Sequence, residues 1–326
     1  SGKTTVLQAI ALTLSLATRR TKSPLDFAWP GFLISRLSTI GPAFVRLIVA
    51  FDDEEIQATR ELYEMWKRFL SPEFIQSHKI VPPSDRGEVT LEYRNGAVSS
   101  PDGFEAKMQF MGRYYIKCLL DTQPDLRSKF RYCGDVFWFD QYRNIVSGPN
   151  NGNHAENGNK SNESSREASV ENIRKYLVGW WMYRFTKNKS GQDYLASLEP
   201  LFQRIFPGTA FSGISMKEHG KPEIFDDYYF LISRNDLEFD ISEMSSGEQS
   251  VFPLLYEFVR LEIARSIILI DELELHLHPP QQQALLSALP KMRPDCQFII
   301  TTHSPYLESS IPDENEKVLR GGTLCL

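Results

Sequence analysis

The sequence predicts a mixed α/β fold, and three patterns carry that prediction. Residues 44–51, FVRLIVAF, alternate in polarity and are rich in β-branched side chains, which is typical of a strand. Residues 266–272, SIILIDE, form a continuous apolar run that suits a strand of a parallel sheet buried on both faces. Other stretches, such as residues 55–70, place apolar side chains along one face of a helix.

Composition and charge favour a globular protein and argue against several classes of function. Of the 326 residues, 41% are hydrophobic and 24% are charged, so a packed core is expected. The net charge of -6 gives no overall attraction for nucleic acid or for an anionic membrane. We find no signal peptide and no apolar run of the roughly 18 residues that span a bilayer, and we therefore expect a cytoplasmic protein. The four scattered cysteines are typical of reduced thiols.

The remaining elements follow from local patterns along the chain. A helix is predicted at residues 6–20, and Asn95-Gly96 predicts a β-hairpin. Residues 147–169 are almost purely Gly, Asn, Ser, Glu and Lys, too polar to bury a core, and they predict a flexible surface loop. Two further helices are expected at residues 170–185 and 193–206. Short strands follow around residues 211–241, and another helix is expected at residues 247–264.

The chain opens with SGKTT, which has the form of the end of a phosphate-binding loop. In the pattern GxxxxGK[ST], the lysine reaches the phosphates and the hydroxyl binds Mg²⁺. Gly2, Lys3 and Thr4 supply these positions, and the first glycine of the pattern would lie five residues before Gly2. We therefore expect the loop to begin upstream of Ser1, although a stretch this short also arises by coincidence.

An acidic pair ends the apolar run near the other end of the chain. An acid at the carboxyl end of a parallel strand lies where α/β sheets bind their ligands. A phosphate-binding loop needs such an acid, because it holds Mg²⁺ from the side opposite the loop hydroxyl. Asp271 is thus a candidate metal ligand together with Thr4, and Glu272 is placed to polarise an attacking water. The alternative is a plain structural strand that happens to end in two acids.

Two more motifs complete a set with a fixed order. MSSGEQ (244–249) precedes a predicted helix, and TTHSP (301–305) follows a predicted strand. The set resembles the ABC-type ATPase heads of the P-loop NTPases, in the soluble branch of chromosome-maintenance, RecF-like and overcoming-lysogenization-defect (OLD) proteins. SGKTT resembles the end of Walker A, ILIDE resembles Walker B, and MSSGEQ resembles the signature, with Ser246 replacing its first glycine. TTHSP resembles the switch-histidine loop, and ELHLHP (274–279) resembles the D-loop region.

The resemblance implies that ATP and Mg²⁺ bind between two heads, so that a homodimer builds the site. The signature serine, Ser245, opens a predicted helix whose N-terminus suits an anion, and in this family it faces the γ-phosphate held by the other protomer. Nucleotide contacts are implied for Ser1, Gly2, Lys3, Thr4, Thr5, Ser245, Ser246, Gly247 and Glu248. Catalytic roles are implied for Glu272, for His303 as the switch, and for Gln141, and metal contacts for Thr4, Asp271 and Gln141.

The implied architecture is one head with a mixed-sheet core and a helical lid. The core lobe would cover about residues 1–143 and 250–326, and the lid about residues 144–249. Three features stay open to other interpretations. Gln141 is equally well an exposed turn residue, His276 and His278 could be metal ligands, and the basic and aromatic RSKFRY stretch could contact nucleic acid, which little else indicates.

The implied function is Mg²⁺-dependent hydrolysis of ATP coupled to dimerisation, as the ATPase component of a bacterial or phage-type defence or repair system. One alternative is an ATP-gated switch that controls an effector protein with little turnover. Another is the ATPase part of an OLD-type nuclease, which needs a further acidic nuclease module. No membrane partner is expected.

Overall fold

The computed structural model has the mixed α/β fold that the sequence predicts. It describes residues 2–34, 37, 41–78, 80–140, 162–186 and 192–319. The helices are α1 (Lys3–Ala17), α2 (Asp53–Arg68), α3 (Pro72–Ser77), α4 (Phe104–Met108), α5 (Gly112–Leu119), α6 (Asn162–Tyr183), α7 (Tyr194–Ile205), α8 (Ser246–Arg260), α9 (Pro279–Met292) and α10 (Pro305–Glu308). The strands are β1 (Phe44–Ala50), β2 (Glu88–Arg94), β3 (Ala97–Ser99), β4 (Val136–Phe139), β5 (Thr209–Met216), β6 (Tyr228–Arg234), β7 (Leu237–Asp240), β8 (Ile267–Ile270) and β9 (Gln297–Ile300).

A parallel sheet in the order β4-β8-β9 lies at the centre of the fold. Its register pairs Phe139 with Ile270 and Ile270 with Ile300, so the three strands end level with one another. The residues that follow these ends therefore come to one edge of the sheet. They are Asp140, Asp271 and Thr301.

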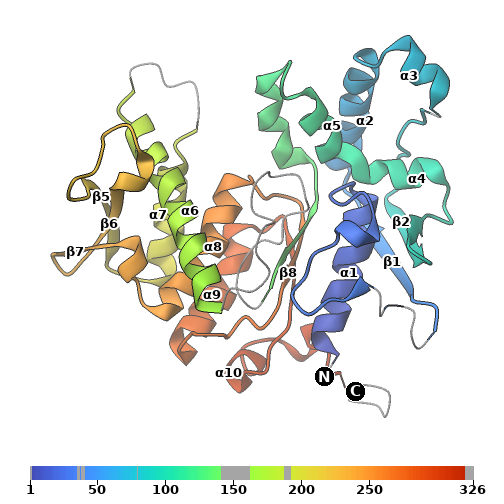
Figure 1. The fold of residues 1–326 in the computed structure, drawn as a ribbon. Coiled ribbons are helices and arrows are strands. Elements are labelled where there is room, and N and C mark those ends of the chain that lie inside the picture. The colour runs from blue at the N-terminus through green and yellow to red at the C-terminus, as the bar shows by residue number, and fades with distance from the viewer. Residues whose placement is uncertain are drawn as a thin grey trace.

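This sheet is covered on both faces, as the continuous apolar run at residues 267–270 predicts. On one face, β4 and β8 pack with α1 and with the antiparallel sheet β1-β2-β3 through one buried cluster. On the other face, they pack with α6, α7, α8 and α9 through a second cluster. Figure 1 shows α1 on one side of β8 and the lid elements on the other. Successive side chains of a strand point to opposite faces of the sheet, so Ile268, Leu269 and Ile270 supply apolar surface to both faces. All three are fully buried.

The β2–β3 hairpin forms where the Asn-Gly pair predicts it. Arg94 pairs with Ala97, which leaves Asn95 and Gly96 as the two loop residues. Their φ angles are 48° and 83°, the left-handed values that a tight two-residue hairpin requires.

The lid region agrees with its prediction in one respect and differs in another. Beside α6 and α7 it contains an antiparallel sheet in the order β5-β6-β7, where short strands are predicted around residues 211–241. Residues 162–169, predicted as loop, form the first turns of α6. Their Glu, Arg and Ala residues favour helix, and extending an existing helix costs far less than nucleating one. The rest of the predicted loop, residues 147–161, lies outside the described residues. Within the described ranges, no helix has the length and apolar character needed to cross a membrane.

A candidate nucleotide site at the carboxyl edge of the parallel sheet

The SGKTT stretch begins α1 directly beside this edge. Gly2 precedes the helix with a φ of 77°, a left-handed conformation that glycine adopts without steric cost. Glycine also brings no side chain to cap the helix, and no side chain caps α1 at this position. The first amides of a helix are free to bind an anion when they lack a cap, so the start of α1 is suited to a phosphate group.

The Thr4 hydroxyl contacts Asp271 across the site. It donates to both carboxylate oxygens, at 3.1 and 3.0 Å, although the two residues are 267 positions apart. Asp271 is buried, with 4% of its surface exposed. A hydroxyl and a carboxylate are oxygen ligands of the kind that Mg²⁺ takes together with substrate phosphates and water. This donor pair therefore fits the predicted metal site.

Thr301, at the end of β9, fixes the orientation of the acidic pair. Its hydroxyl donates to Asp271 Oδ1 at 2.5 Å and accepts a hydrogen bond from the main-chain N–H of Glu272 at 2.9 Å. Glu272 has a φ of 49°, an uncommon conformation for a residue with a side chain. Strained backbone of this kind persists when neighbouring groups hold it, and Thr301 is such a group. Thr301 has no predicted role of its own, and the signal that points to it is its place in the TTHSP stretch, directly after a predicted strand.

Lys3 joins the SGKTT stretch to the TTHSP loop. Its ammonium group donates to the main-chain oxygen of Thr302 and lies 3.5 Å from His303 Nδ1. Glu274 holds the same loop from the other side, because its Oε1 accepts a hydrogen bond from the main-chain N–H of His303 at 2.5 Å. Glu274 Oε2 is buried with no hydrogen-bond partner among the described residues. Glu274 was also missed as a site residue, although it lies in the ELHLHP stretch.

The signature serine caps α8. Ser245 Oγ and its main-chain N–H both donate to Glu248 Oε2, at 2.7 and 2.9 Å. Glu248 is buried and also pairs with Arg234. The structure thus places Glu248 below the helix start, while Ser245 and Ser246 are exposed. Nucleotide contact by any of these residues stays a prediction.

Gly247 packs closely against the ELHLHP stretch. A Cβ atom at this position would lie 3.0 Å from the main-chain oxygen of His276 and 3.2 Å from Gln281 Oε1. These contacts are tighter than ordinary van der Waals separation. The absence of a side chain at Gly247 therefore lets the start of α8 approach the segment between β8 and α9.

Other predicted residues lie at the margin of the site or outside the described chain. Thr5 is exposed on the first turn of α1, and Ser1 and Gln141 fall outside the described residues. His276 and His278 are exposed, and His278 begins α9 as its N-cap. Among the residues that the structure describes, no group of three or more His, Cys, Asp or Glu could hold a metal ion. The structure therefore gives the H-x-H metal site no support.

Comparisons with known proteins agree with these motifs. The family described as "AAA domain, putative AbiEii toxin, Type IV TA system" matches residues 140–309, more than half of the chain. The Retron Ec83 probable ATPase of Escherichia coli is 32% identical over 103 residues, which are 28% of this chain and 19% of that protein. The Septu protein PtuA of Bacillus thuringiensis is 32% identical over 95 residues, which are 25% of this chain and 24% of that protein. The alignments thus span about a fifth to a quarter of these relatives.

Among solved structures, the chain is similar to an SmcHead bound to the C-winged helix domain of ScpA. The TM-score is 0.44 and the identity 15%, with 95% of this chain and 81% of that chain covered. The family match includes the signature, the acidic pair and the TTHSP loop, and it begins directly after β4. The chain therefore belongs to the AAA domain family of putative AbiEii toxins, which confirms the ATPase-family resemblance that its motifs carry.

Proposed function

We propose that this protein binds ATP with Mg²⁺ at the carboxyl edge of the β4-β8-β9 sheet and hydrolyses it between two heads. The observation that carries the proposal is the contact of the Thr4 hydroxyl with both carboxylate oxygens of Asp271. Beside it, Lys3 donates to the main-chain oxygen of Thr302 in the TTHSP loop. These residues come from opposite ends of the chain. Binding of phosphate and a metal ion requires a lysine, a hydroxyl and a carboxylate close together, and these residues meet that requirement. Membership of an AAA domain family also supports ATP hydrolysis.

Each side chain has a role that follows from its chemistry. Lys3 is a flexible cation that can exchange the main-chain oxygen of Thr302 for a phosphate oxygen. Thr4 and Asp271 would hold Mg²⁺, which when bound neutralises charge on the phosphates. Glu272 accepts a proton from the attacking water as general base. His303, exposed beside Lys3, donates a hydrogen bond to the γ-phosphate.

The second head is proposed to complete the site through its signature. Ser245 and Ser246 are exposed at the N-terminus of α8, a helix of 15 residues, where main-chain amides and the helix dipole favour an anion. ATP carries a γ-phosphate that can reach this helix, whereas ADP has no γ-phosphate. ATP, but not ADP, should therefore link two heads.

The proposed biological role is that of the ATPase component of a bacterial or phage-type defence or repair system. The support is the similarity to a retron probable ATPase and to Septu protein PtuA. An effector or nuclease module is the proposed partner.

The test uses light scattering and ATP turnover. Glu272→Gln protein should form dimers with ATP and remain monomeric with ADP. Adding Ser245→Arg should abolish the dimer while nucleotide stays bound, because its bulk blocks docking at the helix start. Ser215→Arg makes the same change at an exposed serine of β5, away from the signature, and should dimerise normally.

Two outcomes would change the proposal. Failure of the wild-type protein to bind ATP would refute it. An ATP-dependent dimer with negligible turnover would replace the hydrolase with an ATP-gated switch.

A further inference from the structure

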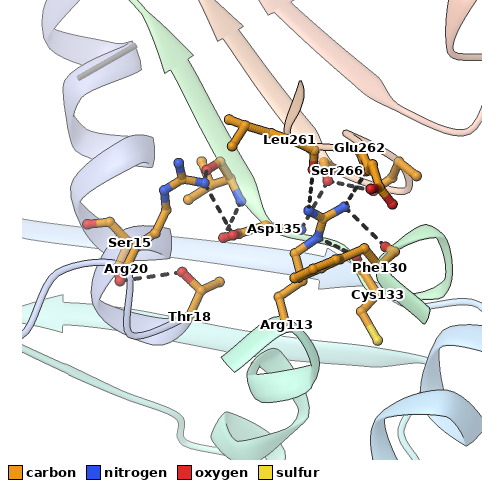
Figure 2. A network of polar contacts seen from close by, with 12 residues as sticks. Ser15, Thr18, Arg20, Arg113, Phe130, Cys133, Asp135, Leu261, Glu262 and Ser266 are labelled. Atoms are coloured by element: carbon orange, nitrogen blue, oxygen red, sulfur yellow. Dashed lines mark hydrogen bonds and ion pairs between the residues drawn. The ribbon is translucent and has the colours of Figure 1, made fainter. Parts of the chain in front are cut away.

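Arg113, on α5, is a buried arginine that the nucleotide site does not use. Only 4% of its surface is exposed, and its guanidinium group donates to four main-chain oxygens. The acceptors are Cys133 at 2.8 Å, Phe130 at 3.1 Å, Leu261 at 3.2 Å and Glu262 at 2.9 Å. Figure 2 shows the guanidinium between these two pairs of residues.

The four oxygens belong to two segments that lead into the parallel sheet. Residues 130–133 come shortly before β4, and residues 261–262 directly follow α8. After residue 262 only four residues remain before β8, the strand that Asp271 and Glu272 directly follow. The segment 261–266, which we call the α8–β8 connection, thus joins the helix of the signature to the strand of the acidic pair.

The α8–β8 connection has a conformation that needs support. Glu262 and Arg265 both have a φ of 48°, in the left-handed region that residues with side chains seldom occupy. Arg127 binds the Glu262 side chain at 2.8 Å, and Arg265 pairs with acids at the start of α2. Arg113 supplies the contacts to the main chain itself. Such conformations persist only when their surroundings hold them, and they are common where a protein must move or transmit a change.

The same network extends to the far end of α1. Arg20, which follows α1, donates to Asp135 Oδ2 at 3.2 Å and to the main-chain oxygen of Val136 at 2.9 Å. The main-chain N–H of Asp135 donates to Ser266 Oγ at 3.1 Å, within the α8–β8 connection. Figure 2 shows this chain of contacts between α1 and the Arg113 cluster. The helix that begins at the phosphate site and the helix that begins at the signature are therefore tied at their opposite ends.

Arginine suits this position for a specific reason. A guanidinium group has five N–H donors in a rigid plane, enough to satisfy oxygens on two separate segments, whereas lysine has three donors at one point. Burial lowers the pKa of the Arg113 guanidinium, because loss of solvation disfavours the charged form. An apolar residue would fill the space at lower electrostatic cost. The directed hydrogen bonds are what such a residue could not replace.

We propose that Arg113 is a positioning residue for ATP hydrolysis, which holds the α8–β8 connection so that docking of the signature on a partner's nucleotide is transmitted to Asp271 and Glu272. The proposal rests on the proposed ATP-dependent dimer. The hydrogen bonds of Arg113 go to main-chain oxygens of residues 130–133 and 261–262, and Arg113 is not among the predicted nucleotide or metal contacts. Its effect should therefore appear in dimerisation and turnover and not in the binding of ATP by a single head.

The experiment compares Arg113→Met and Arg113→Lys with Arg127→Met, a control that removes a half-exposed arginine contacting only the side chain of Glu262 in the same connection. Calorimetry gives the affinity and the stoichiometry of ATP binding. The stoichiometry also measures the fraction of protein that is folded and able to bind ATP. Light scattering gives the dimer dissociation constant, and turnover is expressed per bound nucleotide. Arg113→Met should bind ATP as wild type does. Its dimer dissociation constant should rise, and its turnover should fall, by at least about tenfold, because the loss of one or two buried hydrogen bonds corresponds to that factor.

The remaining variants sharpen the result. Arg113→Lys should recover part of the loss, since one ammonium can serve one of the two segments, and Arg127→Met should behave as wild type. If Arg113→Met does not fold, Ser266→Ala removes one hydroxyl from the same network and should weaken dimerisation in the same direction. An Arg113→Met protein that dimerises normally per folded head would overturn the inference. A wild-type protein without an ATP-dependent dimer would instead refute the proposed function.

Discussion

Replacing Thr301 by valine would remove a single hydroxyl from the candidate site with little change in shape. That hydroxyl donates to Asp271 Oδ1 at 2.5 Å and accepts from the main-chain N–H of Glu272 at 2.9 Å. Thr301 is 8% exposed, so water cannot easily replace either bond. The substitution therefore reports on how strongly β9 orients the acidic pair.

The magnitude follows from the two bonds. A hydrogen bond to a charged group contributes about 1.5–3 kcal/mol, and a neutral one about 0.5–1.5 kcal/mol. The free energy of unfolding should fall by about 2–4 kcal/mol in Thr301→Val. Turnover should fall by up to about 10²-fold, the effect of displacing a reacting group by about 1 Å.

Two measurements on the same proteins decide the matter. Urea denaturation without nucleotide gives the change in unfolding free energy, and steady-state kinetics gives the turnover of ATP. Thr301→Ser is the matched control, because it keeps the hydroxyl and loses only a methyl group. If Thr301→Val is as stable and as active as Thr301→Ser, the hydroxyl does not orient Asp271 and Glu272, and the reasoning is refuted.

Three other predictions can be tested in parallel. Glu272→Gln should lower turnover by about 10²–10⁴-fold with ATP binding retained, and unchanged turnover would remove Glu272 from its role as general base. Gly247→Ala should lower the denaturation midpoint by the equivalent of about 1–3 kcal/mol, because its Cβ would press on His276 O and Gln281; a wild-type midpoint would contradict that close packing. Burial raises the pKa of Glu55 from 4.5 to about 7, so the folded state keeps a proton that the unfolded state has released; stability should fall as pH rises through this window. Glu55→Gln should flatten the difference in denaturation midpoint between pH 5 and pH 8, and an unaltered difference would show that another group titrates.

The parts of the fold that local physics dictates could be predicted from the sequence. The run at residues 267–270 is expected to be buried on both faces because it offers no polar side, and Ile268, Leu269 and Ile270 are fully buried. The hairpin at Asn95-Gly96 follows from the left-handed backbone that this pair tolerates. The pairing of Lys3 and Thr4 with residues 271 and 302–303 could be anticipated only because the chemistry of phosphate binding requires it.

The residues that sequence reasoning missed act through long-range register. Thr301 reaches Asp271 because β8 and β9 pair in parallel with Ile270 beside Ile300, and no local pattern encodes that pairing. Arg113 resembles any other arginine of an amphipathic helix, and only the folded chain brings two distant main-chain segments around it. The helix α6 begins earlier than the sequence predicts for a different reason, because its first residues are polar in composition yet include types that favour helix.

The apolar cluster that joins β4 and β8 to α6, α7, α8 and α9 is continuous, and this limits how the lid can move. A lid hinged on a flexible linker could swing through large angles and leave its contacts intact. Here any such swing would separate buried side chains of the lid helices from those of β4 and β8 and expose them to water. In the proposed dimer, adjustment of Ser245 to a partner's nucleotide should therefore occur by small sliding of packed helices, of the order of 1–2 Å. The position of the signature at the start of α8 then depends on the shapes of the core side chains. Conservative substitutions in the buried cluster would therefore shift Ser245 although they do not contact it.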